Sequence, residues 1–464
     1  HIYVPTVKDM LKTNKQWIFI ILLVIIAMIV FIKWREYYYK KLLHTDTLTQ
    51  IPNKQYFMKT AEKILDNNSD KSYLLTSLDA RNFKLINERF GHIVGDQTLM
   101  NIAKNIKSKF HKNGLYARSQ SDSFLILVED TSQNRELLKS LVDLDISIHN
   151  TTNYKVPLKI GVCPIPRYNP ALSLSLYIDR ANIAKKYTSA RNTNYICYFT
   201  DDMNKKLNMK NVIESEMVRA LSKGEFVVYY QPKYELANDT IIGAEALVRW
   251  NHKEKGIISP GVFIPVFERN GFIVDLDFYV YEQVLKMQKH RLDMGKKVIP
   301  ISMNVSRCHL SDTNFVDKLE AVVAKYKVPK QYIEMEITES IFSQEDSSAI
   351  ALIYNLKEHG FTISMDDFGS GYSSLNLLRK VHIDTLKIDK VFIDSTEDVQ
   401  RSQVIVEEII NMASKIHVKT ICEGVETQSQ RDFLKNAGCN MVQGYFYSKP
   451  LPYEDFSDLL NSSK

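Results

Sequence analysis

Cysteine is scarce in this sequence, and no arrangement of its cysteines suggests a cross-link or a zinc site. There is no CxxC pair and no cluster of cysteine with histidine. We therefore exclude a disulfide-stapled secreted fold and a structural zinc site, and we expect buried thiols in a reducing compartment. The five cysteines are scattered along the chain: Cys163, Cys197, Cys308, Cys422 and Cys439.

A strong charge of either sign is lacking as well. The formal net charge is +6 over 464 residues, and no basic stripe is interleaved with aromatic residues. Because nucleic-acid-binding domains usually carry such a stripe, we expect no nucleic-acid partner. The length predicts two or three domains instead of one core.

Long apolar runs are absent except near the N-terminus. Residues 17–34, WIFIILLVIIAMIVFIKW, carry no charge before Lys33 and have a tryptophan at each end. This pattern predicts a transmembrane helix, preceded by a stub at residues 1–16 and followed by a helical stalk at residues 35–45. A signal-peptide core is the alternative, but the run is long for that role and no small-residue cleavage site follows it.

The orientation of this predicted helix is only weakly specified. Basic residues flank both sides, so the positive-inside rule gives a small preference for a cytoplasmic C-terminal side and an extracytoplasmic stub. The sequence begins with His1 and not with Met, and we expect an upstream segment such as an extracytoplasmic sensor.

The rest of the chain divides into two α/β parts. Residues 46–202 alternate strand-like and helix-like segments, which suggests a sheet covered by helices. A polar stretch rich in lysine and asparagine, residues 200–211, marks the boundary. Residues 203–464 hold eight short apolar runs, most of them separated by helix-length segments. This order predicts a TIM-like (β/α)8 barrel with its active site at the carboxyl ends of the strands.

The first two apolar runs of the predicted barrel are an exception to this order. Only ELANDT, residues 235–240, lies between them, which is too short for a crossover helix. They must therefore form an antiparallel hairpin. A turn centred near Asn238 would place Gln231 opposite Glu245.

Polar side chains gather at the predicted strand ends of this barrel. Charged residues within apolar strands are costly unless they are paired or bind a metal, and the one lysine among them cannot neutralise six carboxylates. The ligand atoms are oxygens, which favours Mg²⁺ or Mn²⁺ over Zn²⁺. Two such ions would stabilise both oxygens of an in-line phosphoryl displacement, so the residues predict a two-metal phosphoesterase. The set comprises Glu245, Asn304, Glu336, Asp366, Asp367, Lys387, Glu423, Glu426 and Gln443.

Seven motifs in this region resemble those of the EAL-domain phosphodiesterases, which linearise the bacterial second messenger cyclic di-GMP to pGpG. The resemblance covers about residues 210–460, and no position that carries the chemistry is substituted. The only departure from the family's pattern is Lys449, a position where arginine is common. The motifs are EALVRW (245–250), NVS (304–306), EITES (336–340), DDFGSGYSSL (366–375), LKID (386–389), EGVE (423–426) and QGYFYSKP (443–450).

The resemblance implies catalytic and metal-binding roles for these residues. Lys387 and Glu423 would act on the nucleophilic water, with Glu426 supporting the site. Two ions, Mg²⁺ or Mn²⁺, would be bound at the strand ends. The implied metal ligands are Glu245, Asn304, Glu336, Asp366 and Asp367, the last of which would hold the second ion.

The resemblance also implies substrate-binding and supporting residues. Arg249 would meet a substrate phosphate, while Gln443 and Gln231 would support the site beside the first metal ligand. Glu339 would hold the glycine-rich loop that follows the two aspartates. We expect the strand to end at these aspartates, so that the turning backbone lets both side chains face one pocket.

Residues 46–202 resemble a GGDEF domain, the diguanylate cyclase module, with a degenerate signature. The similar segments are DTLTQIPNK (46–54), LDARNFKLINERFGHIVGD (78–96) and ANIAKK with ARN (181–192). At residues 120–124, QSDSF replaces two glycines, an acidic residue and Glu-Phe. Since the Gln120 and Ser121 side chains would obstruct a triphosphate, and Arg81 replaces a metal-binding aspartate, we expect no cyclase activity.

Part of the implied nucleotide site persists in this degenerate domain. Asp79 matches the first acidic metal ligand, while Asn87 and Asp96 match positions that recognise guanine. The sequence therefore leaves open whether the domain binds GTP. In the alternative interpretation Asn87 is a helix cap and Asp96 is a loop aspartate. We expect the domain to act as a relay or dimerisation module.

Together these features predict a single-pass protein of the bacterial cytoplasmic membrane with both domains in the cytoplasm. Its predicted activity is cyclic di-GMP hydrolysis, and the resemblance implies a homodimer. A non-hydrolytic cyclic di-GMP receptor or signalling scaffold is the alternative. A bifunctional cyclase and phosphodiesterase is disfavoured by the degenerate signature.

Overall fold

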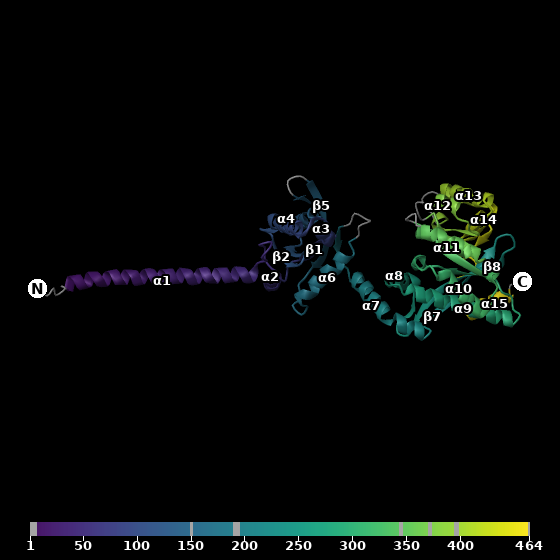
Figure 1. The fold of residues 1–464 in the computed structure, drawn as a ribbon, viewed down its shortest axis with the longest axis horizontal. Helices are drawn as coiled ribbons and strands as arrows, with labels where there is room; N and C mark the ends of the chain where they lie inside the picture. Colours follow the sequence, from purple (N-terminus) through teal and green to yellow (C-terminus); the bar gives the residue numbers. More distant parts are fainter. Residues whose placement is uncertain are drawn as a thin grey trace. The chain divides into compact units, whose positions relative to one another are not determined.

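The computed structural model describes residues 7–148, 152–188, 195–342, 347–369, 374–393 and 399–462. The chain divides into two compact units, residues 1–208 and residues 209–464, called the first unit and the barrel unit below (Figure 1). Helix α7 (Asp201–Ser222) crosses this division, and the domain boundary predicted at residue 203 lies in its first turn.

The first unit is an α/β sandwich around a sheet with strand order β2-β3-β1-β5-β4, in which β6 pairs with β5. Side chains alternate between the two faces of β1. Leu74 and Leu78 pack with residues of α4, whereas Tyr73 and Leu75 pack with residues of α2 and α6. The strands are β1 (Tyr73–Ala80), β2 (Gly114–Gln120), β3 (Ser123–Glu129), β4 (Asp143–Ile148), β5 (Thr152–Ile165) and β6 (Ile196–Tyr198), and the helices are α2 (Lys54–Asn67), α3 (Phe83–Phe90), α4 (His92–Phe110), α5 (Ser132–Lys139) and α6 (Leu174–Lys186).

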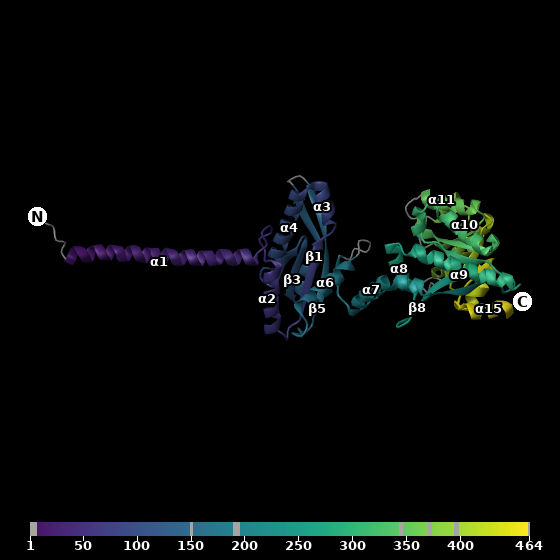
Figure 2. The same ribbon diagram turned by 60° about the horizontal axis from the view of Figure 1, so that its bottom comes forward.

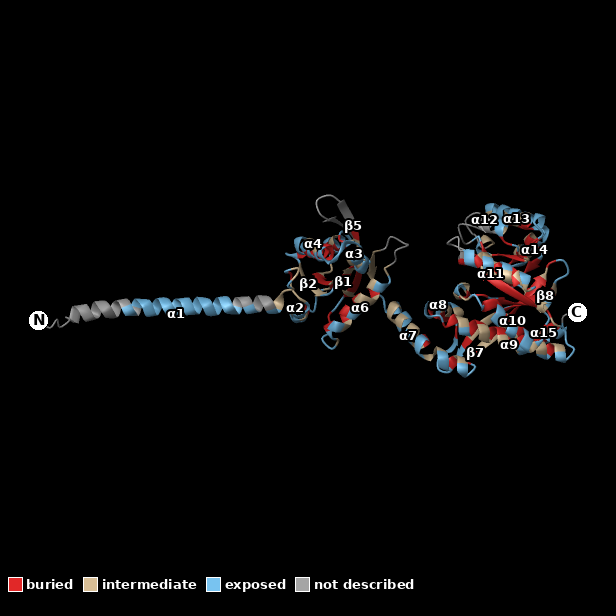
Figure 3. Ribbon diagram, viewed as in Figure 1, coloured by how far each residue is buried: buried red, intermediate tan, exposed pale blue. Residues whose placement is uncertain are grey.

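Helix α1 (Val7–His44) contains both the predicted membrane span and most of the predicted stalk. Its described side chains from Trp17 to Glu36 are exposed (Figure 3). Among the described residues, no helix combines the length and the apolarity needed to cross a membrane. The predicted transmembrane helix is therefore not confirmed. The side chain of Ile18 within that span, and residues 1–6 of the predicted stub, lie outside the described residues.

The described part of the barrel unit closes a ring of eight strands. Their order is β10-β11-β12-β13-β14-β15-β7-β8, and β8 pairs with β10 to complete the ring. Strand β7 is antiparallel to both neighbours, while the other pairings of the ring are parallel. The predicted barrel with an antiparallel first strand is thus confirmed. The strands of the ring are β7 (Phe226–Glu235), β8 (Thr240–His252), β10 (Ile301–Asn304), β11 (Ile333–Thr338), β12 (Thr362–Phe368), β13 (Thr385–Ile388), β14 (Lys419–Cys422) and β15 (Met441–Val442), and β9 (Gly256–Ile258) pairs with β8 outside the ring.

Helices cover the outside of this ring (Figure 2). Helix α9 packs against β7, β8 and β10, while α11 packs against β12 and α13 against β14. This layering leaves the carboxyl ends of the parallel strands free to carry polar residues. Besides α7, the helices are α8 (Pro260–Asn270), α9 (Ile273–Asp293), α10 (Phe315–Tyr326), α11 (Ser347–Glu358), α12 (Ser374–Lys380), α13 (Val399–Lys415), α14 (Gln428–Asn436) and α15 (Tyr453–Ser462).

The hairpin of β7 and β8 has the predicted register. Gln231 is the direct partner of Glu245, and the turn occupies residues 236–239. Asp239 in this turn has a φ of +57°, a left-handed conformation that aspartate tolerates better than most residues. The short linker seen in the sequence therefore fixes which residues face each other.

Strand β12 does not end at its two aspartates, so that expectation was wrong. The strand continues to Phe368, but its register against β13 shifts between Met365 and Phe368. Asp367 lies within this irregularity with a φ of +55°. A local bulge of this kind interrupts the strict alternation of side chains, which is the effect that the strand end was expected to have.

Candidate active site

Four carboxylates converge on one ammonium group inside the mouth of the barrel. Lys387 on β13 is 1% exposed, and its Nζ lies 2.6 Å from Glu423 Oε1. The same atom lies 3.0 Å from Glu336 Oε2, 3.0 Å from Asp366 Oδ1 and 3.5 Å from Glu245 Oε2. These residues come from β8, β11, β12 and the segment after β14. The barrel therefore brings together residues that the sequence separates by up to 178 positions (423 minus 245).

The amide side chains of Gln443 and Asn304 hold the Glu245 carboxylate by hydrogen bonds. Gln443 Nε2 donates to Glu245 Oε2 at 2.7 Å and to Gln231 Oε1 at 3.1 Å. Asn304 Nδ2 donates to Glu245 Oε1 at 3.3 Å. Both oxygens of this carboxylate are thus oriented by hydrogen bonds, and the predicted supporting place of Gln231 and Gln443 matches these contacts.

A second buried lysine, Lys233, belongs to the cluster and was missed from the sequence. Its Nζ lies 2.9 Å from Glu334 Oε2 and 2.9 Å from Glu336 Oε1. The expectation that a single lysine faces the carboxylates was therefore wrong. Lys233 follows Gln231 by two residues on β7, so period-two alternation was the signal that could have placed it on the same face.

Burial and the two ammonium groups give the carboxyl groups of the cluster different pKa values. Burial alone would raise the pKa of Glu336, but Lys233 and Lys387 lower it to about 2. Burial raises the pKa of Glu423 to about 8 in spite of the neighbouring lysine, and burial followed by the charge of Glu336 raises the pKa of Glu245. The carboxylates of this cluster exceed its ammonium groups, so the site holds surplus negative charge that favours cations.

The two adjacent aspartates of β12 have different surroundings. Asp366 pairs with Lys387, and its Oδ1 also accepts a hydrogen bond from the Asp367 N–H at 2.9 Å. Burial, followed by repulsion from Asp366 and Asp389, raises the pKa of Asp367 to about 6. Asp367 therefore lies beside the cluster, but Lys387 is not its direct partner.

The loop after these aspartates is held at its first residue. The Gly369 N–H donates to Glu339 Oε2 at 2.9 Å, which is the contact expected of Glu339. Gly369 has a φ of +95°, and a Cβ there would lie 2.3 Å from the Phe392 ring, so the position requires glycine. Residues 370–373, the rest of the glycine-rich loop, lie outside the described residues.

Helix α9 supports the end of β10 from behind. The Tyr281 hydroxyl donates to the Asn304 carbonyl oxygen at 2.9 Å. Asp277 Oδ2 accepts from the Ser306 N–H at 3.3 Å and lies 2.9 Å from His309 Nε2. These contacts fix the segment that carries Asn304, and no motif in the sequence indicated them.

Two predicted residues lie at the margin of the cluster. The Glu426 side chain is exposed, and its backbone N–H donates to Gln430 Oε1 at 2.9 Å. Arg249 is half-buried on β8, four residues after Glu245 and on the same face, with its guanidinium 5.6 Å from the Tyr229 ring centroid. Arg249 can thus reach a ligand at the barrel mouth, whereas Glu426 is not brought into the cluster.

The described residues contain no group of three or more His, Cys, Asp or Glu side chains arranged to hold a metal ion. In the cluster the Lys387 ammonium lies between the carboxylates, and the predicted ligand set stays a prediction. The chemistry of the donors still suits a hard divalent cation, because all are carboxylate or amide oxygens.

The predicted nucleotide residues of the first unit are not brought to one pocket. Asp79 lines a cavity of about 750 Å³, whose lining includes neither Asn87 nor Asp96. Asn87 packs against Gly95, where a Cβ would lie 1.9 Å from Asn87 Oδ1, and Asp96 is exposed on α4. Of the third similar segment, residues 190–192 lie outside the described residues.

Comparison with known families gives two matches along the chain. The model of the EAL domain matches residues 214–450, and the model of the diguanylate cyclase, GGDEF domain, matches residues 43–192. The first match covers just over half of the chain, including the whole cluster around Lys387.

Curated relatives share both matched regions. The bifunctional diguanylate cyclase/cyclic di-GMP phosphodiesterase MucR of Pseudomonas aeruginosa is 28% identical over 88% of this chain and 60% of its own. The signaling protein YkoW of Bacillus subtilis is 31% identical over 90% of this chain and 53% of its own. The cyclic di-GMP phosphodiesterase NbdA of P. aeruginosa is 30% identical over 91% and 54%. This chain thus spans between half and two thirds of the length of these relatives.

Solved structures resemble the barrel unit and the longer chain. The PaMucR phosphodiesterase in complex with c-di-GMP is 32% identical with a TM-score of 0.50, over 53% of this chain and 99% of that one. The EAL enzyme Bd1971 in its cGMP-bound form has a TM-score of 0.53 over 84% of this chain and 95% of that one. At 23% identity, the second likeness shows the fold alone.

Proposed function

The chain belongs to the EAL-domain family, and from that premise we propose that its barrel hydrolyses cyclic di-GMP to linear pGpG. The observation that carries this proposal is the convergence of Glu245, Glu336, Asp366 and Glu423 on Lys387. Relatives named as cyclic di-GMP phosphodiesterases, and a 32% identical phosphodiesterase solved with c-di-GMP, support the choice of substrate.

The cluster would hold divalent cations, Mg²⁺ or Mn²⁺, through its oxygen donors. When bound, such ions lower the pKa of a water molecule and stabilise charge on phosphate oxygens. The donor chemistry and the surplus of carboxylates over ammonium groups support this assignment. The proposed ligands are Glu245, Asn304, Glu336, Asp366 and Asp367.

The side chains of this chain would position the substrate and move the proton. A water oxygen bonds to phosphorus, the bond between phosphorus and the 3′ oxygen breaks, and the departing oxygen takes up a proton. Glu423 Oε1, which lies 2.6 Å from the Lys387 ammonium, would accept the proton of the attacking water, and Lys387 would stabilise the negative charge that develops on that water. Arg249 would bind a phosphate oxygen of the substrate, and Glu426 would support the site from its edge.

Turnover of cyclic di-GMP by the purified full chain tests this function. With Mn²⁺ or Mg²⁺ present, we expect pGpG by liquid chromatography, and we expect Glu245→Ala to abolish it while circular dichroism stays unchanged. The exposed Lys296→Met variant is the matched control and should keep full turnover. Absence of pGpG from the wild-type protein would contradict the proposal.

A receptor that binds cyclic di-GMP without hydrolysis is the second candidate. It is favoured by the position of the Lys387 ammonium between the carboxylates, 3.0 Å from Glu336 Oε2. Calorimetry with the same protein separates the two functions. Binding without pGpG supports the receptor, whereas turnover supports the enzyme.

We also propose that the first unit lacks cyclase activity and serves as a regulator. Gln120 and Ser121 stand where the family has glycines, and Ser121 has a φ of +49° at the hairpin turn. Incubation of the full chain with GTP should yield no cyclic di-GMP. If GTP changes the turnover of the barrel and Asn87→Ala removes that change, the unit binds GTP.

Membrane attachment and dimerisation complete the proposal. The exposed apolar side chains of α1, among them Phe19, Ile25 and Phe31, support insertion of residues 17–34 into the cytoplasmic membrane of a bacterium. The full chain should then resist extraction by alkaline carbonate, and deletion of residues 1–36 should release it. Light scattering of the detergent-solubilised chain should give the mass of a dimer.

A further inference from the structure

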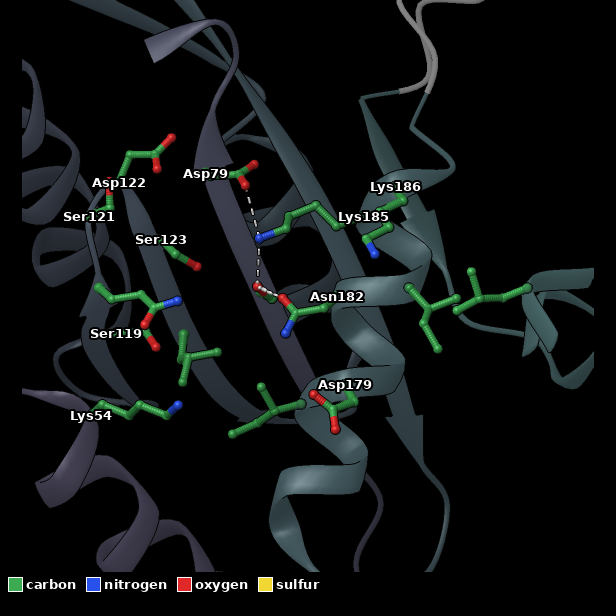
Figure 4. A pocket seen from close by; sticks show the side chains of 16 residues that line it. Lys54, Asp79, Ser119, Ser121, Asp122, Ser123, Asp179, Asn182, Lys185 and Lys186 are labelled. Carbon is green, nitrogen blue, oxygen red and sulfur yellow. Dashed lines mark hydrogen bonds and ion pairs between the residues drawn. The ribbon is translucent and has the colours of Figure 1, made fainter. Parts of the chain in front are cut away.

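The first unit already holds a cation beside Asp79, and this cation belongs to the chain itself. Asp79 lies near the end of β1, and the Lys185 Nζ from α6 lies 3.0 Å from its Oδ2. Figure 4 shows the lysine reaching from the helix towards the strand, with the pair at the centre of the pocket. The two side chains are 27% and 12% exposed, so water screens the pair only in part.

Lys185 is held in this position by a short hydrogen-bond chain. Its Nζ donates to the Ser77 Oγ at 3.1 Å, and that hydroxyl donates to Asn182 Oδ1 at 2.7 Å (Figure 4). Ser77 is fully buried on β1, two residues before Asp79 and on the same face. The ammonium group therefore has two partners on one strand.

The backbone of Lys185 is fixed as well. Gly161 on β5 lies so close to α6 that a Cβ there would be 2.0 Å from the Ala181 carbonyl oxygen and 2.3 Å from the Lys185 nitrogen. Because α6 packs this tightly on the sheet, the position of the Lys185 backbone is fixed. From this position the side chain extends to β1, where Asp79 lies.

With the Lys185 ammonium in contact with Asp79, the residues around this carboxylate do not fit a divalent cation. The match to the GGDEF domain implies a metal ligand at this position. Here Arg81 stands where the family has a second aspartate, and Lys185 is in contact with the first. The remaining neighbour, Asp122, is half-buried, and burial, followed by the charge of Asp79, raises its pKa, so its ionised form is disfavoured.

The pocket has no surplus of carboxylates over ammonium groups. Three lysines, Lys54, Lys185 and Lys186, and three aspartates, Asp79, Asp122 and Asp179, are among the residues that line the cavity of about 750 Å³, and the ionised form of Asp122 is disfavoured. Two positive charges added by a divalent cation would meet the Lys185 ammonium at close range.

We propose that Lys185 takes the place of the divalent cation in the first unit, which therefore keeps its pocket without a metal. This inference concerns the first unit and deepens its proposed lack of cyclase activity. It does not depend on whether the barrel hydrolyses cyclic di-GMP.

Metal stoichiometry of the full chain tests the proposal. The protein is stripped with EDTA and dialysed against Mn²⁺, and bound Mn²⁺ per chain is measured by atomic spectrometry. The barrel contributes equally to every variant, because none of the substitutions touches it. We expect the wild type and Asp79→Asn to bind the same number of ions.

Removal of the ammonium group should create a metal site. Lys185→Met should bind one additional Mn²⁺ per chain, and the double variant Lys185→Met/Asp79→Asn should lose that ion again. Lys186→Met removes a neighbouring ammonium of the same pocket and is the matched control, with no gain expected. Lys185→Gln, which keeps a donor for Ser77, is the second variant if methionine impairs folding.

Two results would overturn the inference. One is a loss of one Mn²⁺ on Asp79→Asn in the otherwise wild-type chain, because Asp79 would then bind a metal in spite of Lys185. The other is a folded Lys185→Met or Lys185→Gln variant that gains no ion. Thermal unfolding gives an independent check, since Mn²⁺ should raise the melting temperature of Lys185→Met beyond its effect on the wild type.

Discussion

Replacement of Lys233 by methionine should destabilise the barrel unit by about 3–5 kcal/mol, the cost typical of removing one partner of a buried ion pair. The lysine is 2% exposed, and its ammonium lies 2.9 Å from both Glu334 Oε2 and Glu336 Oε1. Methionine keeps the length of the side chain and removes the charge. The Glu334 carboxylate then loses this ammonium group, and of the two lysines Glu336 keeps only Lys387, which lies 3.0 Å from its Oε2.

A second substitution should recover part of this loss. In Lys233→Met/Glu334→Leu the ion pair is replaced by apolar groups of similar size, which is often nearly neutral in buried positions. Glu336 keeps Lys387 as its partner in this variant. We therefore expect the double variant to regain at least about half of the lost free energy of unfolding.

Urea unfolding followed by tryptophan fluorescence measures both variants. Trp250 is fully buried in the barrel unit, and Trp17→Phe with Trp34→Phe leaves it as the single tryptophan of the chain. Lys296→Met, at an exposed lysine of the same unit, should change the free energy of unfolding by less than about 0.5 kcal/mol. The reasoning is refuted if Lys233→Met lies within about 1 kcal/mol of the parent, or if Glu334→Leu adds to the loss.

Three further predictions concern the site itself. Gly369→Ala should cost about 1–3 kcal/mol of stability and lower turnover, because its φ is +95° and the new Cβ meets the Phe392 ring; wild-type melting and turnover would contradict this. Chelation of divalent cations by EDTA should abolish pGpG formation and added Mn²⁺ should restore it, whereas persistent turnover would exclude a metal-dependent site. Asp367→Asn should reduce turnover without lowering the melting temperature at pH 7. The raised pKa of about 6 means that the folded chain binds the Asp367 proton more tightly than the unfolded chain does. Ionised Asp367 therefore lowers the stability of the folded chain above that pKa, and asparagine removes this cost. A lower melting temperature of the variant would contradict this explanation.

Short-range geometry was predictable from the sequence. The register that places Gln231 opposite Glu245 follows from a linker of a few residues, because hairpin geometry is set by loop length. The convergence of Glu336, Asp366 and Lys387 followed from their positions at consecutive strand ends, since parallel strands of a barrel present these ends together.

Contacts between distant side chains were not predictable in the same way. The partners of Lys233 lie 101 and 103 residues away, and a lysine in an apolar strand does not reveal which carboxylate it will meet. The bulge at Asp367 depends on pairing between β12 and β13, and the sequence of β12 alone gave no sign of it. Glu426 belongs to a motif with Glu423, yet the backbone beyond β14 leaves it exposed, so a shared motif did not imply a shared pocket.

The reversed direction of β7 decides at which end the chain reaches the barrel. In a barrel of parallel strands the first strand starts at the face away from the catalytic residues. Here Phe226, the first residue of β7, pairs with Trp250 near the carboxyl end of β8, and Glu225 just before it accepts from the Trp250 indole N–H at 3.2 Å. The polypeptide that precedes the barrel therefore arrives on the rim that carries the proposed substrate site. Insertions or fusion joints placed directly before Phe226 would alter substrate access before they alter the stability of the ring.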